Sequence, residues 1–403
     1  MSTLGKTHRN AGDLDPIFAE DGVIDIGPGS CGSVVETKTG RIVYVYDSAG
    51  GLQLIRAYGD GSFDPSFVNP LWQFGPKYSA SRQLAIQDDD SIVAIGSTGD
   101  DFNRLAAVTK FNEHGSQNLV FGTKIFPDIP LAPGQRVITH EAKGCALSDG
   151  RVLLGQSHIL YDGTGVAVEG SGTIRCYRPN GDLDDTFGRN GEAEIIFDNA
   201  RYSSIESIKP KQQGGFIVSG SLDNSTGNQS EPKSVLASFD VNGKLDKGFA
   251  TGGLYKISEE YSLSNNVGVS PRGITFAASE LSAEGISVAT VRLQNDGTPD
   301  PRFNNGQVLR IDMNGRVVTI QNVVVPPDGS IIVGVRSDHV LTLLRILENG
   351  ERDEDFGDGG VARLEGWRMN DCIVQSITGR IIAAADEIDP AGKPLARVLG
   401  FVG

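Results

Sequence analysis

The stretch NGDLDDTFGRNG, residues 180–191, contains three glycines, three aspartates and a single phenylalanine. Glycine, asparagine and aspartate are typical of turns, because glycine tolerates positive φ angles and the other two hydrogen-bond to nearby backbone groups. A large aromatic side chain is unusual in such a turn. Its presence is explained by the recurrence of the same spacing along the whole chain.

The spacing Gly-x-x-Asp-x-x-Phe occurs at seven places in the chain, with asparagine replacing aspartate once. Successive phenylalanines of the motif lie between 49 and 66 residues apart, so one unit of structure is repeated from end to end. The seven stretches are GDLDPIF (12–18), GSFDPSF (61–67), GSQNLVF (115–121), GDLDDTF (181–187), GKLDKGF (243–249), GTPDPRF (297–303) and GERDEDF (350–356).

Each residue of the motif has an expected structural role. The aspartate side chain accepts the N–H groups two or three residues further on, as in an Asx turn or an N-cap. The phenylalanine anchors the turn by burying its ring, which contributes about 1.5–3 kcal/mol. Seven calcium loops are the alternative, but each unit offers only one or two carboxylates, whereas calcium takes six to eight oxygen ligands. We therefore favour structural turns.

Between the motifs, each unit has an alternating strand, a turn, an apolar strand and a third strand, and a short strand follows the Phe turn. Four short strands per unit, without amphipathic helices, are typical of a propeller blade. The sequence thus predicts an all-β fold, a seven-bladed β-propeller of four-stranded antiparallel blades. The apolar strands are RIVYVY (41–46), SIVAIG (91–96), RVLLGQ (151–156), GFIVSG (215–220), GITFAA (273–278), SIIVGV (330–335) and RIIAAA (380–385).

The combination of the turn NG.LD.tFG..G, the step DG.ilvaG and a third strand of the type laRl resembles the delta-60 repeat, a bacterial family. The resemblance covers residues 11–403, and Asn118 is its one departure from the Gly-Asp-Phe frame. It implies a β-propeller and supplies no catalytic residues. We accordingly expect an N-terminal tail at 1–10 and a single propeller domain at 11–403.

The two ends of the chain each lack part of a unit. DGVIDI (21–26) has no partner strands upstream, and the last unit ends at PLARVLGFVG (394–403) without an outer strand. Antiparallel pairing of about 21–26 with about 395–400 removes both exposed edges, which sheet proteins otherwise have to protect. We predict that this pairing closes the ring.

The composition excludes several classes of function. A net charge of −15 disfavours binding to nucleic acids and to anionic membranes. No apolar run is long enough to span a membrane, and the N-terminus lacks the apolar region of a secretory signal, so we expect a cytoplasmic protein or export by another route. We expect a monomer.

No cofactor, metal or nucleophile motif is present. The chain lacks a P-loop, a GxSxG turn and a dinucleotide fingerprint, so we expect no cofactor. His140 beside Glu141 is a weak metal hint, because none of the five histidines has HxH or HExxH spacing. Cys31, Cys145, Cys176 and Cys372 lack zinc spacing and are expected to be buried thiols, with pairing of Cys31 and Cys372 left open.

One face of the predicted propeller has loops of unequal length, and function concentrates on such loops. These loops are 127–141, 156–172, 221–234, 279–285 and 386–394. We predict ligand-binding residues just before the inner strands, on exposed loops where alanine changes alter stability by about 0.5 kcal/mol or less. The predicted ligand-binding residues are Arg82, His140, Arg201, Tyr202, Asn265 and Asp371, with Glu141, Asn266, Arg316, Arg368 and Asn370 as further candidates at the channel mouth.

The fold alone does not separate two functions. We favour a non-enzymatic binding propeller whose ligand is a protein or a carbohydrate, and the alternative is a hydrolase or lyase acting at the channel mouth. Trp72 and Trp367 are candidates for stacking on a sugar or for packing between blades. A strongly perturbed pKa beside a polar central pocket favours the enzyme, and a flat or dry mouth favours the binder.

Overall fold

The computed structural model describes residues 10–100, 103–225 and 230–403. The expected tail at 1–10 lies outside the described residues except for Asn10, and so do residues 226–229 of the loop 221–234. Within the described ranges the chain is all-β, and its helical content is one short 3₁₀ turn, η1 (Asn304–Gly306).

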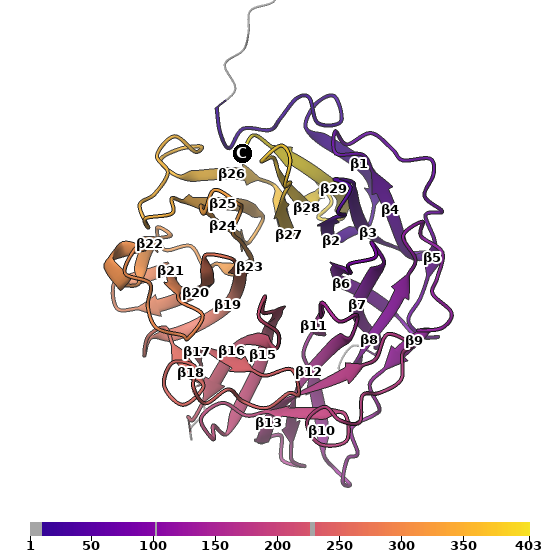
Figure 1. The fold of residues 1–403 in the computed structure, drawn as a ribbon, viewed down its shortest axis with the longest axis vertical. Coiled ribbons are helices and arrows are strands. Elements are labelled where there is room, and N and C mark those ends of the chain that lie inside the picture. The colour runs from indigo at the N-terminus through magenta and orange to yellow at the C-terminus, as the bar shows by residue number, and fades with distance from the viewer. Residues whose placement is uncertain (1–9, 101–102, 226–229) are drawn as a thin grey trace, which may run out of the picture.

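The sheets of the described chain are arranged around a common centre, and the strands within each sheet follow one another outward from it (Figure 1). The first half contains two four-stranded antiparallel sheets. They are β2 (Ser30–Glu36), β3 (Ile42–Ser48), β4 (Gly51–Ala57) and β5 (Leu71–Trp72), followed by β6 (Ser79–Ile86), β7 (Ile92–Gly99), β8 (Arg104–Phe111) and β9 (Thr123–Ile125).

The middle of the chain forms a nine-stranded sheet whose two halves are joined by a single parallel bridge between Gly170 and Tyr202. The first half is β10 (Arg136–Thr139), β11 (Lys143–Ala146), β12 (Val152–Tyr161), β13 (Ala167–Tyr177) and β14 (Glu192–Ile195). The second half is β15 (Tyr202–Pro210), β16 (Phe216–Asp223), β17 (Lys233–Phe239) and β18 (Leu254–Lys256). Both β10 and β11 pair with β12, so together they replace one inner strand.

Two more four-stranded antiparallel sheets follow. They are β19 (Tyr261–Ser270), β20 (Gly273–Ser282), β21 (Gly285–Leu293) and β22 (Leu309–Asp312), then β23 (Thr319–Val324), β24 (Ile331–Ser337), β25 (Val340–Ile346) and β26 (Val361–Glu365).

The last sheet combines both ends of the chain, with the order β1-β29-β28-β27. It contains β1 (Val23–Pro28), β27 (Trp367–Val374), β28 (Ile381–Ile388) and β29 (Pro394–Phe401). Val23 lies opposite Leu399, and a bulge between Asp25 and Gly27 shifts the register before β1 ends. Arg397 Nη1 donates to Asp25 Oδ1 at 2.6 Å across this pair, so the N-terminal strand forms the outer edge of a sheet built from C-terminal residues.

The repeated turns have the expected geometry. Asp64 Oδ1 accepts the N–H of Ser66 at 2.9 Å, and the same bond to the residue two positions on recurs at the other five aspartates of the motif. Asn118 instead accepts the N–H of Phe121, three positions on. All seven phenylalanines of the motif are buried, with at most 4% of the residue exposed. The predicted roles of both residue types are confirmed.

The glycines of the motif are needed for two reasons. Gly115 and Gly243 have φ angles of +90° and +77°, which L side chains rarely adopt. A Cβ atom at Gly115 would also lie 2.8 Å from the ring of Phe67, and one at Gly243 would lie 2.6 Å from the ring of Phe187. At these two positions the motif glycine therefore lets its turn pack directly on the phenylalanine ring of the turn before it.

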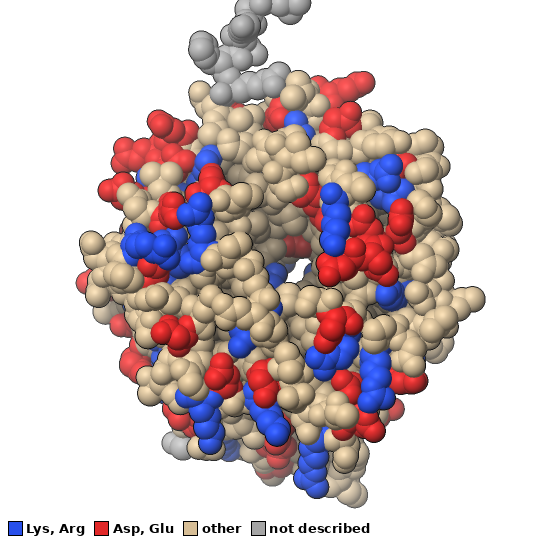
Figure 2. Space-filling view, viewed as in Figure 1, with Lys and Arg blue, Asp and Glu red and all other residues tan. Residues whose placement is uncertain are grey.

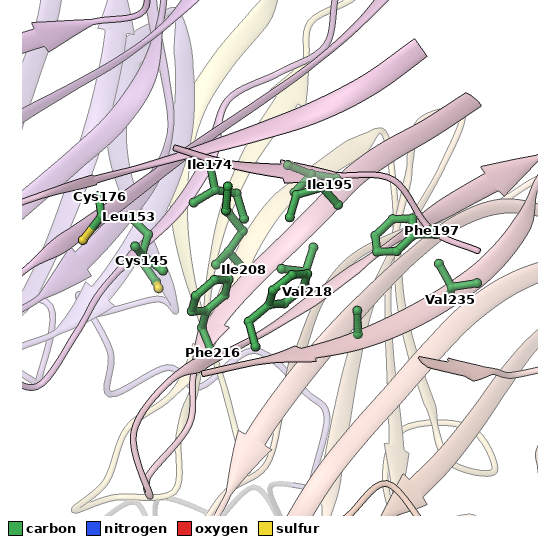
Figure 3. Close-up of a cluster of buried hydrophobic side chains, with 14 of the residues drawn as sticks. Cys145, Leu153, Ile174, Cys176, Ile195, Phe197, Ile208, Phe216, Val218 and Val235 are labelled. Carbon is green, nitrogen blue, oxygen red and sulfur yellow. The ribbon is translucent and has the colours of Figure 1, made fainter. Parts of the chain in front are cut away.

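The apolar core lies between neighbouring sheets. Figure 3 shows a cluster between the two halves of the nine-stranded sheet, where Leu153 and Ile174 of the first half face Ile208 and Phe216 of the second. The four cysteines are buried, and none forms a disulfide, in agreement with the expectation of buried thiols. Trp72 is buried as well and packs edge-on against Phe74 and Phe111, so packing is its role rather than sugar stacking.

Candidate binding site at the central channel

The inner strands of the sheets surround a central cavity of about 560 Å³, which appears as an opening in the middle of the molecule (Figure 2). Its walls come from β2, β6, β11, β15, β19, β23 and β27. Six of these strands contain a register shift near their first residues, and bulges of this kind re-aim side chains. The residues at the shifts, all of which line the cavity, are Gly32, Arg82, Glu206, Leu263, Gln321 and Asn370.

Amide side chains of the cavity wall join neighbouring inner strands. Asn266 donates to the carbonyl of Gln321 at 2.9 Å, and Gln83 and Gly144 exchange two hydrogen bonds. The same kind of contact links Asn322 to Cys372 and Asn370 to Cys31, each at 2.9 Å. These amides are already satisfied by protein partners, so their main role is to hold the inner strands together.

Asp371 is the centre of a hydrogen-bonded chain that crosses several sheets. Its carboxylate accepts from the Ser33 hydroxyl at 2.5 Å, from Asn322 Nδ2 at 2.7 Å and from the N–H of Cys372 at 2.8 Å. Ser33 Oγ in turn accepts the N–H of Leu84. Desolvation raises the pKa of Asp371, although the Ser33 hydroxyl and nearby Lys209 oppose that shift. The carboxylate is thus committed to protein contacts.

Asp386 of β28 is a second carboxylate beside the cavity. It accepts from the N–H of Cys31 at 2.9 Å and from the Ser30 hydroxyl at 3.0 Å. Burial raises its pKa, and the hydrogen bonds from Asn370 and Cys31 together with the charge of Arg82 work in the opposite direction. Both oxygens of Asp386 therefore have protein partners.

The basic residues of the cavity have weaker partners. Arg82 Nη1 donates to Ser30 Oγ at 3.1 Å, and Arg368 Nε donates to His339 Nδ1 at 3.2 Å. Among the described residues, the guanidinium of Arg336 has neither a hydrogen bond nor a carboxylate within 4 Å. Desolvation lowers the pKa of Arg336, and the other two arginines add to that effect. These three side chains remain available to a ligand.

Glu141 and Lys143 form an ion pair at 3.7 Å on the cavity wall. Desolvation in the channel opposes the charged form of Glu141, whose side chain is 63% exposed, but Lys143, Arg82 and Arg336 outweigh that effect, so the pKa of Glu141 ends below its ordinary value. Glu141 and Arg336 both line the cavity, and the charge of each favours the ionised form of the other.

The structure separates the predicted site residues into three groups. Arg82, Asn265 and Asp371 line the cavity, and His140 lies in an adjoining hollow with Glu141. Glu141, Asn266, Arg368 and Asn370 also line the cavity. Arg201 and Tyr202 lie elsewhere and both donate to the carbonyl of Ala167, whereas Arg316 is exposed and pairs with Glu365.

The expectation of exposed loop positions is wrong for four of the six predicted ligand-binding residues, which lie within strands and are not exposed: Arg82, Tyr202, Asn265 and Asp371. Asn265 is 2% exposed, and its amide donates to the carbonyl of Gly220 and to the Ser234 hydroxyl. Asp371 lies within β27 and supports the chain of hydrogen bonds through Ser33. The inner strands begin earlier than expected, and their register shifts turn these polar groups toward neighbouring sheets.

Sequence reasoning missed Arg336, Lys209 and Asp386, which also line the cavity. A pattern in the sequence identifies two of these residues. It is the sixth position of the apolar second strand of each unit, where Ile331 is the first position in β24. Serine occupies that position in four units, and a charged residue occupies it in the three others. The residues in chain order are Asp47, Ser97, Ser157, Ser221, Ser279, Arg336 and Asp386.

The described residues contain no cluster of three or more His, Cys, Asp or Glu side chains arranged to hold a metal ion. Within the same ranges, no helical segment has the length and apolar character of a membrane span.

No protein-family model and no curated protein matches this sequence. Among solved structures, Drosophila semaphorin 2a matches with a TM-score of 0.51 and 5% identity over 98% of this chain and 76% of its own. Polysaccharide lyase Uly1 matches with a TM-score of 0.48 and 10% identity over 100% of this chain and 94% of its own. A prolyl endopeptidase matches with a TM-score of 0.49 and 11% identity over 94% of this chain and 47% of its own.

This chain thus spans about half the length of the prolyl endopeptidase. At such identities the likeness concerns the fold alone, which is propeller-like. The matched structures include enzymes as well as a semaphorin, so they do not separate binding from catalysis.

Proposed function

We propose that the chain forms a seven-bladed propeller of the delta-60 type, in which the nine-stranded sheet counts as two blades. The single bridge between Gly170 and Tyr202 supports that division, because every other pairing in the sheet lies within one half or the other. The proposed ring is closed by β1 and β29.

A repeated backbone hydrogen bond supports the closure. The residue after each motif phenylalanine donates its N–H to the residue before the next motif glycine at six junctions, at 2.7–3.0 Å. Five of these junctions join motifs that are neighbours in the chain, and the sixth joins the last turn to the first. At the remaining junction the N–H of Gly122 donates to the carbonyl of Asn118 instead. The donor and acceptor pairs are Ala19 to Asp60, Val68 to His114, Gly188 to Asn242, Ala250 to Asp296, Asn304 to Asn349 and Gly357 to Ala11.

Deletion of residues 1–28 tests the closure. The truncated chain loses β1 and exposes the apolar edge of β29, so we expect aggregation in size-exclusion chromatography. A truncated chain that stays monomeric and melts like the full-length protein contradicts the proposed closure.

The proposed function is ligand binding at the central cavity, without catalysis. The observation that supports it most directly is that the acidic and the basic groups of the cavity wall differ in their protein partners. The carboxylates with raised pKa, Asp371 and Asp386, have their oxygens occupied by protein donors, whereas Arg82, Arg336 and Arg368 have no carboxylate partner. Charged groups without a protein partner are suited to binding a ligand. A general acid or base has to be free to exchange a proton, and these two carboxylates are held by protein donors.

A hydrolase or lyase is the second candidate, and the raised pKa values of Asp371 and Asp386 beside a polar cavity favour it. An enzyme requires one of these carboxylates to release a protein partner when substrate binds. The proposed binder requires no such rearrangement.

A glycan array and a pull-down from the native lysate identify the ligand class, and hydrogen exchange then locates it. Binding is expected to protect amides at the channel mouth, and the bound ligand is expected to be recovered unchanged by mass spectrometry. Protection confined to the Gly-Asp-Phe turns contradicts the proposed site. Cleavage that is abolished in Asp371→Asn or Asp386→Asn supports the enzyme instead.

A further inference from the structure

Three arginines lie at the same end of the channel. Arg368 is the second residue of β27, and Arg336 of β24 lies opposite Thr319, the first residue of β23. Arg82 donates to Ser30, the first residue of β2. All three line the same cavity of about 560 Å³, and each lies at or beside the first residues of an inner strand, which places them at the mouth that bears the long loops.

The missing carboxylate partners distinguish these arginines from others of the chain. Arg56, Arg292, Arg345 and Arg380 each pair with the aspartate of a Phe turn at 3.1 Å or less. Within the described ranges, Arg82, Arg336 and Arg368 have no carboxylate oxygen within 4 Å. A partly buried guanidinium without a counter-ion is costly, and an oxyanion supplied from outside offsets that cost.

The charge of the cavity wall differs from that of the whole chain. The wall contains five basic residues against four acidic ones, whereas the chain has a net charge of −15. Two of the four acids, Asp371 and Asp386, are occupied by hydrogen bonds from the protein. The cavity wall thus has a small excess of basic residues within an acidic molecule, and these residues are Arg82, Lys143, Lys209, Arg336 and Arg368.

We infer that the channel mouth binds a small ligand with one or two oxyanionic groups, such as the carboxylate of an acidic sugar. This inference rests on the proposed binding function and names its ligand class. Arginine presents a planar fork that suits carboxylate and sulfate oxygens. The cavity falls within the ~300–1,000 Å³ typical of small-molecule sites. A long polyanion is disfavoured, because the acidic surface outside the mouth repels it.

Isothermal titration with glucuronate and glucose tests the inference, because the two sugars differ only in the carboxylate that replaces a hydroxymethyl group. Inorganic sulfate and oligogalacturonate extend the series to a free oxyanion and to a polyanion. We expect glucuronate to bind more tightly than glucose, sulfate to compete with it, and added sodium chloride to weaken it.

Arg82→Gln and Arg336→Gln are each expected to weaken glucuronate binding about ten- to hundredfold, the usual effect of losing a charged hydrogen bond. Arg316→Gln is the matched control. It removes the same charge from an exposed arginine outside the cavity, which pairs with Glu365 at 3.5 Å, and it is expected to leave binding unchanged.

Four outcomes overturn the inference. Equal binding of glucose and glucuronate, or equal effects of Arg336→Gln and Arg316→Gln, removes the anion site but leaves the proposed binding function intact. Tighter binding of oligogalacturonate than of glucuronate contradicts the small ligand. If no anion binds, the inference fails, and the proposed function then depends on whether the glycan array and pull-down find a neutral sugar or a protein.

Discussion

The two faces of the molecule use arginine in opposite ways. On the face of the Phe turns, Arg292 and Asp300 pair at 2.9 Å with both side chains 1% exposed, and the guanidinium lies over the ring of Phe303. At the channel mouth, Arg82 and Arg336 have no carboxylate partner in the described chain. Both faces are built from the same repeated unit. The arginines of the turn face stabilise the fold through ion pairs, whereas those of the channel mouth lack a carboxylate partner among the described residues.

The turn face shows how strictly a partner is maintained there. The N–H of each motif aspartate donates to one position of the third strand, which is Arg292 in one unit but Cys176 and Gly400 in two others. In those two units, Arg151 and Arg380 reach the aspartate from the start of the second strand instead. The position of the positive charge is therefore kept even where the residue that supplies it changes.

The largest expected effect concerns the anchors of the turns. Phe187→Ala removes a ring that is 0% exposed and is expected to lower the free energy of unfolding by about 3–5 kcal/mol. Urea denaturation measures this loss. Phe63→Ala removes an exposed ring and serves as a control with little expected effect. Similar losses in both variants contradict the anchor role.

Arg292→Met tests the paired arginine. The change leaves Asp300 buried with only the exposed Arg302 beside it, and we expect a loss of about 3 kcal/mol in unfolding free energy. The double variant Arg292→Met, Asp300→Asn is expected to recover part of that loss, because it removes the uncompensated charge. Additive losses in the double-mutant cycle contradict the pairing.

Asp371→Ala tests whether the polar wall of the channel is structural. The change leaves the Ser33 hydroxyl, Asn322 and a backbone N–H without their acceptor, and we expect a loss of about 1–3 kcal/mol. A change in unfolding free energy within experimental error contradicts this structural role of Asp371.

Acid sensitivity distinguishes the carboxylates of the two faces. The Thr186 hydroxyl and Arg151 hold the pKa of Asp184 below its ordinary value of 3.8 despite burial, so Asp184 stabilises the folded state above that pH. This contribution disappears as the pH falls through the folded pKa. Asp386 has a raised pKa and therefore the opposite sign, since its ionisation costs stability as the pH rises.

Urea denaturation at pH 3 and pH 6 tests the opposite effects of Asp184 and Asp386 on the pH dependence of stability. Asp184→Asn is expected to lose less stability on acidification than the unmodified protein, and Asp386→Asn is expected to lose more. Equal slopes for both variants contradict the assignment.

The smallest expected effect is that of Arg336→Gln on stability. Because its guanidinium has no partner among the described residues, we expect a change within about 0.5 kcal/mol. The difference in unfolding free energy between Arg336→Gln and Arg292→Met is the most direct test of the difference between the two faces. A large loss in Arg336→Gln shows that this arginine also has a structural role.

The sequence by itself determined the repeated turns and the all-β class. Each turn is local, since Asp64 bonds to the backbone of Ser66 and Phe67 anchors the same turn, so spacing alone identifies it. The strand pattern followed for the same reason, because the alternation of polar and apolar residues is set within a few positions.

Only the tertiary structure decided which polar residues form the channel. A register shift of one residue changes the direction in which the following side chains point. The position of the shift is set by the pairing between strands and not by spacing along the chain. Asn265 and Asp371 therefore have protein partners, although the sequence marks them as exposed. Arg336 and Arg82 lie far apart in the chain, and only the arrangement of the sheets around one centre brings their unpaired charges to one cavity.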